Sequence, residues 1–83
     1  MNNTYQIYLI SDSTGETLDR IFLALKAQFK NFNYKTHQCS FTRTENQILK
    51  ILEICKKNRN SIILYTIVDS NLAKFLTQES NKI

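Results

Sequence analysis

The sequence contains a single glycine, no proline and no tryptophan, and the scarcity of glycine excludes two kinds of nucleotide site. With Gly15 as its only glycine, the chain has neither the G-x-x-x-x-G-K-[ST] loop of P-loop proteins nor the G-x-G-x-x-G turn of dinucleotide-binding domains. No apolar run approaches the roughly 18 to 20 residues of a membrane-spanning helix. The first residues, MNNTYQ, lack the basic and apolar segments of a signal peptide. We therefore expect a cytoplasmic chain with no membrane partner.

Cysteine and histidine are also scarce, with two cysteines and one histidine in the chain. Cys39 and Cys55 have no second pair and no histidine at a metal-ligand spacing, so we expect two reduced, packed thiols and no metal site. His37 lies inside a predicted strand with no partner evident from the sequence, and we assign it no role as base or ligand.

The net charge of +4 is only moderately basic. A nucleic-acid-binding domain gathers its lysines and arginines on one face or along one helix. Here the lysines are scattered, and Lys56 and Lys57 are their only adjacent pair. The abundance of Lys, Asn and Ile is typical of A/T-rich codons, so we expect no nucleic-acid partner.

The hydrophobic pattern predicts alternating strands and helices. Strands are predicted at 5–10, 34–41 and 61–68, and helices from Leu18 to about Asn33, from a capping box of Thr44 and Gln47, and after a cap at Asp69 or Ser70. The apolar stripe of the first helix is Leu18, Ile21, Phe22, Leu25, Phe29 and Phe32. The β-α-β-α-β-α order predicts an α/β fold with a three-stranded parallel sheet, half of a doubly wound fold, in one domain spanning 1–83.

The second and third strands differ in composition. The second strand interleaves polar residues throughout, which suits an edge of the sheet. The third strand, SIILYTIV, is nearly continuous in apolar residues, as in a parallel strand that is covered on both faces, so we expect it not to lie at an edge. Because a lone three-stranded sheet is marginally stable, we expect the fold to be incomplete.

Polar residues follow each predicted strand, at the edge where parallel α/β sheets bind ligands. These residues fall in 11–17, 42–44 and 69–71. Gly15 permits a positive φ or a close approach to a ligand, and amides at a helix start favour an anion. Arg43 is the best phosphate clamp. The candidate phosphate- or substrate-binding residues are Ser11, Ser13, Thr14, Gly15, Thr17 and Arg43, and the candidate catalytic residues are Asp12, Arg43 and Asp69.

Each of these assignments has a structural alternative. The carboxylates of Asp12 and Glu16 repel an anion unless a metal, an arginine or a proton neutralises their charge. Ser13 and Glu16 also fit the S-x-x-E pattern of a capping box. Arg43 could equally be a solvated loop arginine, and Asp69 a helix cap. The pattern alone leaves these alternatives open.

Three runs carry a more specific signature: IYLISDSTGETLDRIFLALKAQF at 7–29, FTRTENQ at 41–47 and ILYTIVDSNLAKFL at 63–76. In these runs, which cover nearly the whole chain, the sequence resembles the N-terminal part of the pyruvate, phosphate dikinase regulatory proteins, a family also called phosphoenolpyruvate synthetase regulatory proteins. The resemblance implies that Ser11–Thr17, Arg43 with Thr44, and Asp69 are the family-patterned positions.

The resemblance also implies an activity and its reactants. Members of the family are bifunctional: an ADP-dependent Ser/Thr kinase phosphorylates a threonine beside the catalytic histidine of the dikinase, and a phosphate-dependent pyrophosphorylase removes that phosphate and releases pyrophosphate. The implied substrates are ADP and inorganic phosphate. The implied partner is pyruvate, phosphate dikinase or phosphoenolpyruvate synthetase.

The chain departs from the family in length. Family members are much longer, and their Gly-rich nucleotide-binding loop, which ends in a Lys-Thr pair, lies in a later portion without counterpart here. We therefore assign no residue to ADP, expect no ligand to bind tightly to this chain alone, and expect a fragment that works with a second chain carrying that loop. The alternatives are a non-catalytic module that binds phosphate or the dikinase, and a vestigial product of a truncated gene.

Overall fold

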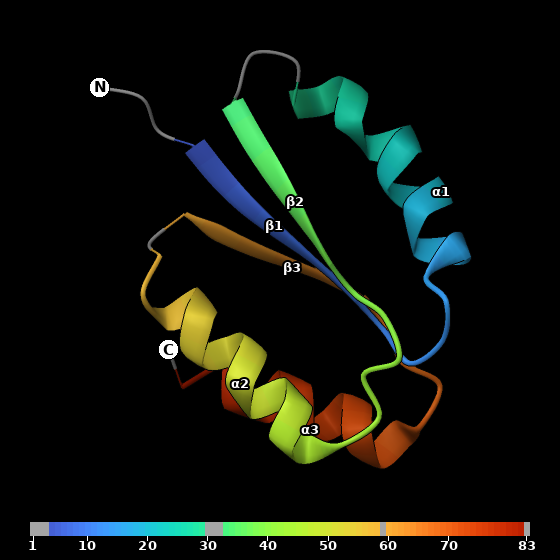
Figure 1. Ribbon diagram of the computed structural model, residues 1–83, viewed down its shortest axis with the longest axis vertical. Coiled ribbons are helices and arrows are strands. Elements are labelled where there is room, and N and C mark those ends of the chain that lie inside the picture. Colours follow the sequence, from blue (N-terminus) through green and yellow to red (C-terminus); the bar gives the residue numbers. More distant parts are fainter. Residues whose placement is uncertain (1–3, 30–32, 59, 83) are drawn as a thin grey trace.

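A computed structural model describes residues 4–29, 33–58 and 60–82 of the chain. The elements in chain order are β1 (Thr4–Ser11), α1 (Glu16–Leu25), the 3-10 helix η1 (Lys26–Phe29), β2 (Asn33–Cys39), α2 (Glu45–Lys56), β3 (Ser61–Thr66) and α3 (Ser70–Ser80). The predicted β-α-β-α-β-α order is confirmed (Figure 1).

The three strands form one parallel sheet in the order β2-β1-β3. β1 is central and has five consecutive buried residues, Ile7–Ser11. The predicted edge position of β2 is confirmed. The expectation that β3 avoids an edge was wrong, because the chain passes from β2 across β1 and, in the part that the structure describes, β3 pairs with β1 alone.

Helices cover both faces of the sheet, α1 on one face and α2 with α3 on the other (Figure 1). The side chains of β1 alternate between two cores, as the pleat of a strand requires. Ile7 and Leu9 pack against Leu18 and Phe22 of α1. On the opposite face, a larger cluster consists of Tyr8, Ile10, Ile48, Leu52, Cys55, Leu72 and Leu76. The fold is therefore a three-layer α/β arrangement built around β1.

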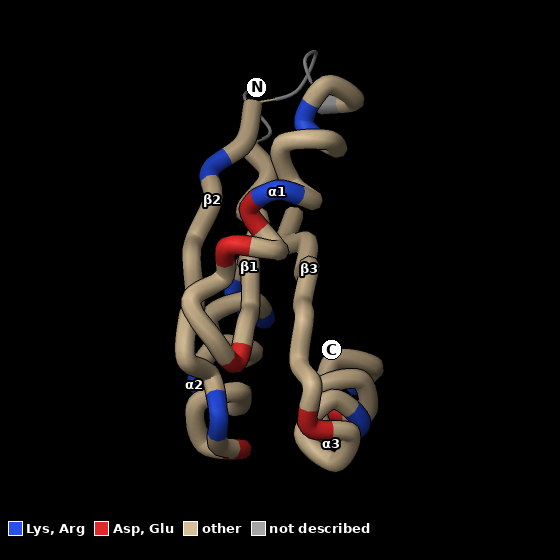
Figure 2. The backbone as a smooth tube through the Cα atoms, turned by 90° about the vertical axis from the view of Figure 1, so that its right-hand side faces the viewer, with Lys and Arg blue, Asp and Glu red and all other residues tan. Residues whose placement is uncertain are grey.

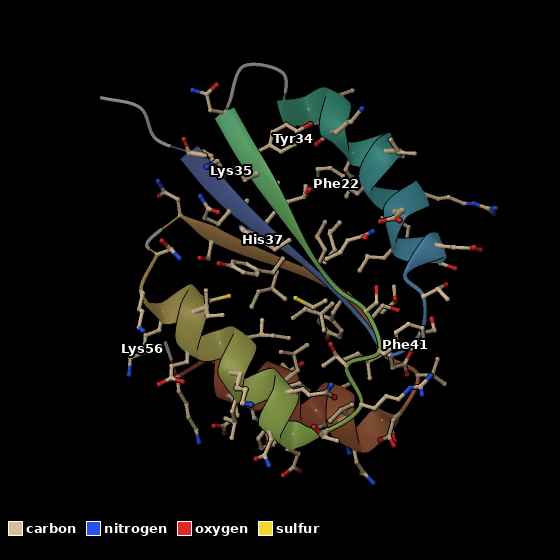
Figure 3. The ribbon with its side chains drawn as sticks, in the orientation of Figure 1. Phe22, Tyr34, Lys35, His37, Phe41 and Lys56 are labelled. Carbon is tan, nitrogen blue, oxygen red and sulfur yellow. The ribbon has the colours of Figure 1, made fainter. Side chains whose placement is uncertain are left out.

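The first helix is shorter than predicted. α1 ends at Leu25 and continues as η1 to Phe29, while the predicted Phe32 lies outside the described residues. Within the predicted stripe, Ile21 is 43% exposed. Among the described residues α1 is the only α-helix on its face, so the flank of its apolar stripe has no second helix to pack against. Phe22 instead meets Tyr34 of β2 edge-on, with ring centroids 5.6 Å apart (Figure 3).

Candidate functional site

The first loop of the candidate site turns at Gly15, directly before α1. Gly15 has a φ of 88° and occupies the N-cap position of the helix without a side-chain cap. Of the two roles considered for this glycine, a positive φ or a close approach to a ligand, the structure shows the positive φ. The Ser13–Glu16 capping box is not formed, because Gly15 takes the cap position and the Ser13 amide donates to the Ser11 hydroxyl, 3.1 Å away. The amides at the start of α1 therefore receive no side-chain acceptor from the described residues.

The loop after β2 lies against this turn. Ser40 Oγ donates to the Thr14 carbonyl at 3.0 Å, and the Phe41 amide donates to the Ser13 carbonyl at 3.0 Å. Phe41 has a φ of 56°, an unusual backbone conformation for a bulky residue, and its side chain is 50% exposed beside the loops (Figure 3). The sequence analysis did not identify Phe41 as a candidate, because phenylalanine is not a residue type that indicates a left-handed backbone conformation.

Arg43 is held at the junction of these two loops. Its Nε donates to the backbone carbonyl of Asp12 at 2.9 Å, and its guanidinium carbon lies 5.1 Å from the centre of the Phe41 ring. The Nη groups have no hydrogen bond to any described residue. The predicted capping box of Thr44 and Gln47 is confirmed and fixes the backbone that follows. Arg43 thus presents unused donors from a side chain that is already oriented.

Asp12, in the loop after β1, contacts both the loop after β2 and the loop after β3. Its Oδ2 accepts a hydrogen bond from the Val68 amide at 2.9 Å. The next residue, Asp69, accepts from the Leu72 amide at 3.0 Å and caps α3, so its capping alternative is what the structure shows. Both carboxylates therefore hold backbone amides. At this carboxyl end of the sheet, acidic and basic positions both occur among the loops (Figure 2).

The candidate hydroxyls differ in their access to solvent. Ser11 is only 1% exposed, and its Oγ lies 3.2 Å from that of Ser13. Ser13, Thr14 and Thr17 are exposed. Ser13, Thr14 and Arg43 are therefore exposed on two loops that contact each other, and Thr17 is exposed in the first turn of α1. Gly15 and Ser11 are buried within the turn.

The three loops at the carboxyl end of the sheet, 11–17, 40–44 and 67–71, form the rim of the domain. Side chains away from this rim have structural surroundings. His37 Nε2 lies 2.6 Å from Gln6 Oε1, and its ring stacks on Tyr8. Cys39 and Cys55 are free thiols, and burial raises the pKa of Cys55 to about 11. Over residues 4–29, 33–58 and 60–82, no group of three or more His, Cys, Asp or Glu side chains is arranged to hold a metal. No helix of that same part is long and apolar enough to cross a membrane.

The architecture and the rim define the class: a parallel α/β domain whose polar loops meet at the carboxyl end of the sheet. The family model of the kinase/pyrophosphorylases matches residues 7–83, and the chain belongs to this family. The resemblance inferred from the three sequence runs is thereby confirmed.

Several curated relatives bear the provisional name pyruvate, phosphate dikinase regulatory protein. One from Pelagibacter ubique (strain HTCC1062) is 67% identical over 82 residues, which are 99% of this chain and 30% of that relative. One from Geotalea uraniireducens (strain Rf4) is 43% identical over 92% of this chain and 28% of its own length. One from Alkaliphilus oremlandii (strain OhILAs) is 43% identical over 89% of this chain and 26% of its own length. The chain thus spans less than a third of these relatives and corresponds to their N-terminal part.

Proposed function

We propose that this chain provides the phosphate-binding and target-docking part of a bifunctional enzyme that regulates pyruvate, phosphate dikinase or phosphoenolpyruvate synthetase in the cytoplasm. In the kinase direction, the hydroxyl oxygen of a target threonine attacks the β-phosphorus of ADP. A new O–P bond forms, the bond to the α-phosphate oxygen breaks, AMP leaves and the threonine proton is released. The membership of the chain in the kinase/pyrophosphorylase family supports this kinase reaction and the pyrophosphorylase reaction described next.

The reverse regulatory step uses phosphate as the nucleophile. An oxygen of inorganic phosphate attacks the phosphorus of the phosphothreonine, the P–O bond to threonine breaks, and the threonine oxygen takes up a proton. The products are threonine and pyrophosphate. Such transfers depend on groups that position the phosphates and neutralise their charge, with little covalent chemistry required of the protein.

The observation that carries the proposal is the pairing of Arg43 with the turn at Gly15. The Arg43 Nε bond to Asp12 and the Phe41 ring hold the guanidinium beside the turn, while its Nη donors stay available. The amides at the start of α1 have no side-chain cap, and a helix start favours an anion. The exposed hydroxyls of Ser13, Thr14 and Thr17 add neutral donors. An inorganic phosphate or a phosphothreonine suits this set.

Exposed apolar residues at the same rim support a protein as the second substrate. Phe41 is 50% exposed and Val68 is 91% exposed. Their amides are bound to Ser13 and Asp12 of the first loop, so both residues flank the proposed phosphate position. A target segment docked on Phe41 and Val68 would bring its threonine to the turn.

ADP binds elsewhere in this proposal. The one-glycine sequence excludes a Gly-rich nucleotide loop here, and each of the relatives extends well beyond the matched segment. A second chain, or the remainder of a longer one, supplies the nucleotide loop. The isolated chain therefore binds phosphate weakly and catalyses neither direction.

A complementation assay tests this proposal. The chain is mixed with dikinase phosphorylated on its regulatory threonine, phosphate, and a polypeptide comprising the Pelagibacter ubique relative beyond the matched segment. Pyrophosphate release is then measured against reactions that lack either polypeptide. Release that requires both supports the proposal. If that polypeptide does not fold, a chimaera in which this chain replaces the matched segment of the relative is assayed. An inactive chimaera beside an active relative contradicts the proposal.

A non-catalytic module that binds phosphate or the dikinase is the second candidate function. The observation that favours it is the engagement of both rim carboxylates: Asp12 holds the Val68 amide and Asp69 caps α3, so neither is left as an uncommitted general base. Titration calorimetry with phosphate, pyrophosphate and dikinase distinguishes the two functions. Heat of binding together with an inactive chimaera identifies the module, and no heat from any ligand rejects it.

A further inference from the structure

β3 is an edge strand with the composition of a central strand. The other edge, β2, carries exposed polar residues such as Lys35 and Gln38, which protect an edge from further pairing. In β3, the apolar residues Ile62, Ile63 and Leu64 are only half-buried and Tyr65 is 43% exposed. Strands buried on both faces of parallel sheets are the ones that read as continuous apolar runs.

The backbone of β3 offers a free row of hydrogen-bonding groups. At one end of the strand, the Gln6 amide donates to the Asn60 carbonyl at 2.8 Å, and beyond the other end the Val68 amide donates to Asp12. In a strand the N–H and C=O of one residue point to the same side, and this side alternates from residue to residue, so those of Ile62, Leu64 and Thr66 point toward β1. The N–H and C=O groups of Ser61, Ile63 and Tyr65 point away from β1, where no other described strand lies.

The position of α3 shows on which side a following strand belongs. α1 lies on one face and carries the chain from β1 to β2, whereas α2 lies on the other face and carries it back past β1 to β3. Leu72 and Leu76 place α3 on the same face as α2. Because crossovers between parallel strands are right-handed, a helix on this face moves the chain further in the β2-to-β3 direction. The next strand then lies beyond β3.

The apolar surface beside β3 continues into an open groove. A groove of about 510 Å³ lies between β3 and the C-terminal parts of α2 and α3. Its walls combine Ile63, Tyr65, Cys55 and Leu76 with the polar residues Lys56, Asn58, Ser61 and Ser80. An apolar strand beside β3 would cover the exposed side of this surface. In Figure 1 the outer side of β3 is not covered by β1 or β2.

From these observations we infer that the outer edge of β3 pairs with a parallel strand supplied by the polypeptide that follows the matched segment in the family. The Pelagibacter ubique relative has most of its length outside the match, and the match corresponds to its N-terminal part, so such a polypeptide exists in the relatives. A second copy of this chain is a poorer occupant, because two-fold pairing of β3 with itself would be antiparallel and would not follow from the position of α3. The inference depends on the fold and the family, not on the proposed activity.

Site-resolved hydrogen exchange tests this inference. The amides of Ile63 and Tyr65 are compared in the 83-residue chain and in a chimaera in which this chain replaces the matched segment of the Pelagibacter ubique relative. The two outward amides are expected to exchange about 100-fold more slowly in the chimaera. The Leu64 amide, which faces β1, is the internal reference and is expected to be protected in both proteins.

A pair of variants separates edge pairing from side-chain packing. In the chimaera, Tyr65→Pro removes the outward amide, whereas Tyr65→Ala removes the same side chain and keeps the amide. Protection of Ile63 is expected to persist in Tyr65→Ala and to be lost in Tyr65→Pro. If the chimaera does not fold, the aligned amides of the intact relative are measured instead.

Rapid exchange of the outward amides in the folded chimaera or in the relative overturns the inference. So does protection that appears in the 83-residue chain alone and rises with its concentration, because a second copy would then be the occupant. Neither measurement needs ADP, phosphate or dikinase. A paired strand without catalysis therefore rejects only the proposed function, and catalysis without a paired strand rejects only this inference.

Discussion

The guanidinium of Arg43 is tethered to the backbone of Asp12, with Nε 2.9 Å from the Asp12 carbonyl oxygen. The same residue uses its carboxylate to hold Val68. One residue of the loop after β1 therefore fixes both the cation after β2 and the start of the loop after β3. The rim is a connected unit, and changes at Asp12 and Arg43 should have separable effects on stability and on anion binding.

Replacing Arg43 should weaken anion binding without unfolding the chain. Arg43→Lys keeps the charge but loses the planar fork and the Nε bond, so we expect the affinity for pyrophosphate to fall by about 10-fold. Calorimetry or a fluorescence competition assay measures the change. Arg20→Lys, on the exposed side of α1, is the matched control and should leave the affinity unchanged. An unchanged affinity in Arg43→Lys would show that only the charge matters and would contradict the role given to the planar fork.

Asp12→Ala should loosen the third loop. Loss of the acceptor leaves the Val68 amide without its partner, and we expect a decrease of about 1 to 2 kcal/mol in the free energy of unfolding. Asp12→Asn keeps an acceptor oxygen and should cost less. Urea unfolding and the exchange rate of the Val68 amide measure both effects. A Val68 amide that exchanges equally slowly in the alanine variant would contradict the role given to the carboxylate.

Gly15→Ala should destabilise the turn through its backbone. At a φ of 88°, a residue with a Cβ is strained by roughly 1 to 2 kcal/mol, and the added Cβ would also lie 3.4 Å from Ser40 Oγ. Gly15→Asn should cost less backbone strain, because asparagine tolerates left-handed conformations better than alanine. Thermal and urea unfolding compare the two variants. Equal or greater loss in the asparagine variant would point to crowding by the side chain instead of backbone strain.

The buried thiol of Cys55 should make stability fall at alkaline pH. Burial raises its pKa from 9.0 to about 11, so the unfolded chain loses this proton at a lower pH than the folded chain. The contribution is fully present below pH 9 and is lost between pH 9 and 11, at a total of about 2 to 3 kcal/mol. Urea unfolding at a series of pH values measures the slope. Cys55→Ala should flatten it in this window, and an unchanged slope would assign the effect to other groups.

The sequence predicts the order of the elements because periodicity and capping are local properties. Thr44 and Gln47 form the predicted cap since they lie three residues apart on one turn. The edge position of β3 could not be predicted from its composition, because strand order depends on where the crossovers run. The run SIILYTIV has the composition of a strand that is covered on both faces, whereas in the part of the chain that the structure describes β3 has a neighbouring strand along one edge only.

The rim was predicted as a set of residue types but not as a hydrogen-bonded unit. Local pattern placed 11–17, 42–44 and 69–71 at one end of the sheet. It did not show that Asp12 would bind Val68, since these residues are far apart in sequence, nor that Phe41 would adopt a φ of 56° and stack with Arg43. Tertiary contacts decide both features. Tertiary contacts also decided which of the possible helix caps form: Ser13 does not cap α1, whereas Asp69 caps α3.

The most direct test of the central claim is a titration of the isotopically labelled chain with pyrophosphate, followed by the amide resonances and the Arg43 Nε resonance. Phosphate binding at the rim predicts saturable shifts confined to Ser13–Thr17 and Arg43, which disappear in Arg43→Ala. Sodium chloride at the same ionic strength controls for salt. Shifts that are absent, or that are spread over the scattered lysines and survive the Arg43 substitution, would contradict a phosphate site at this rim.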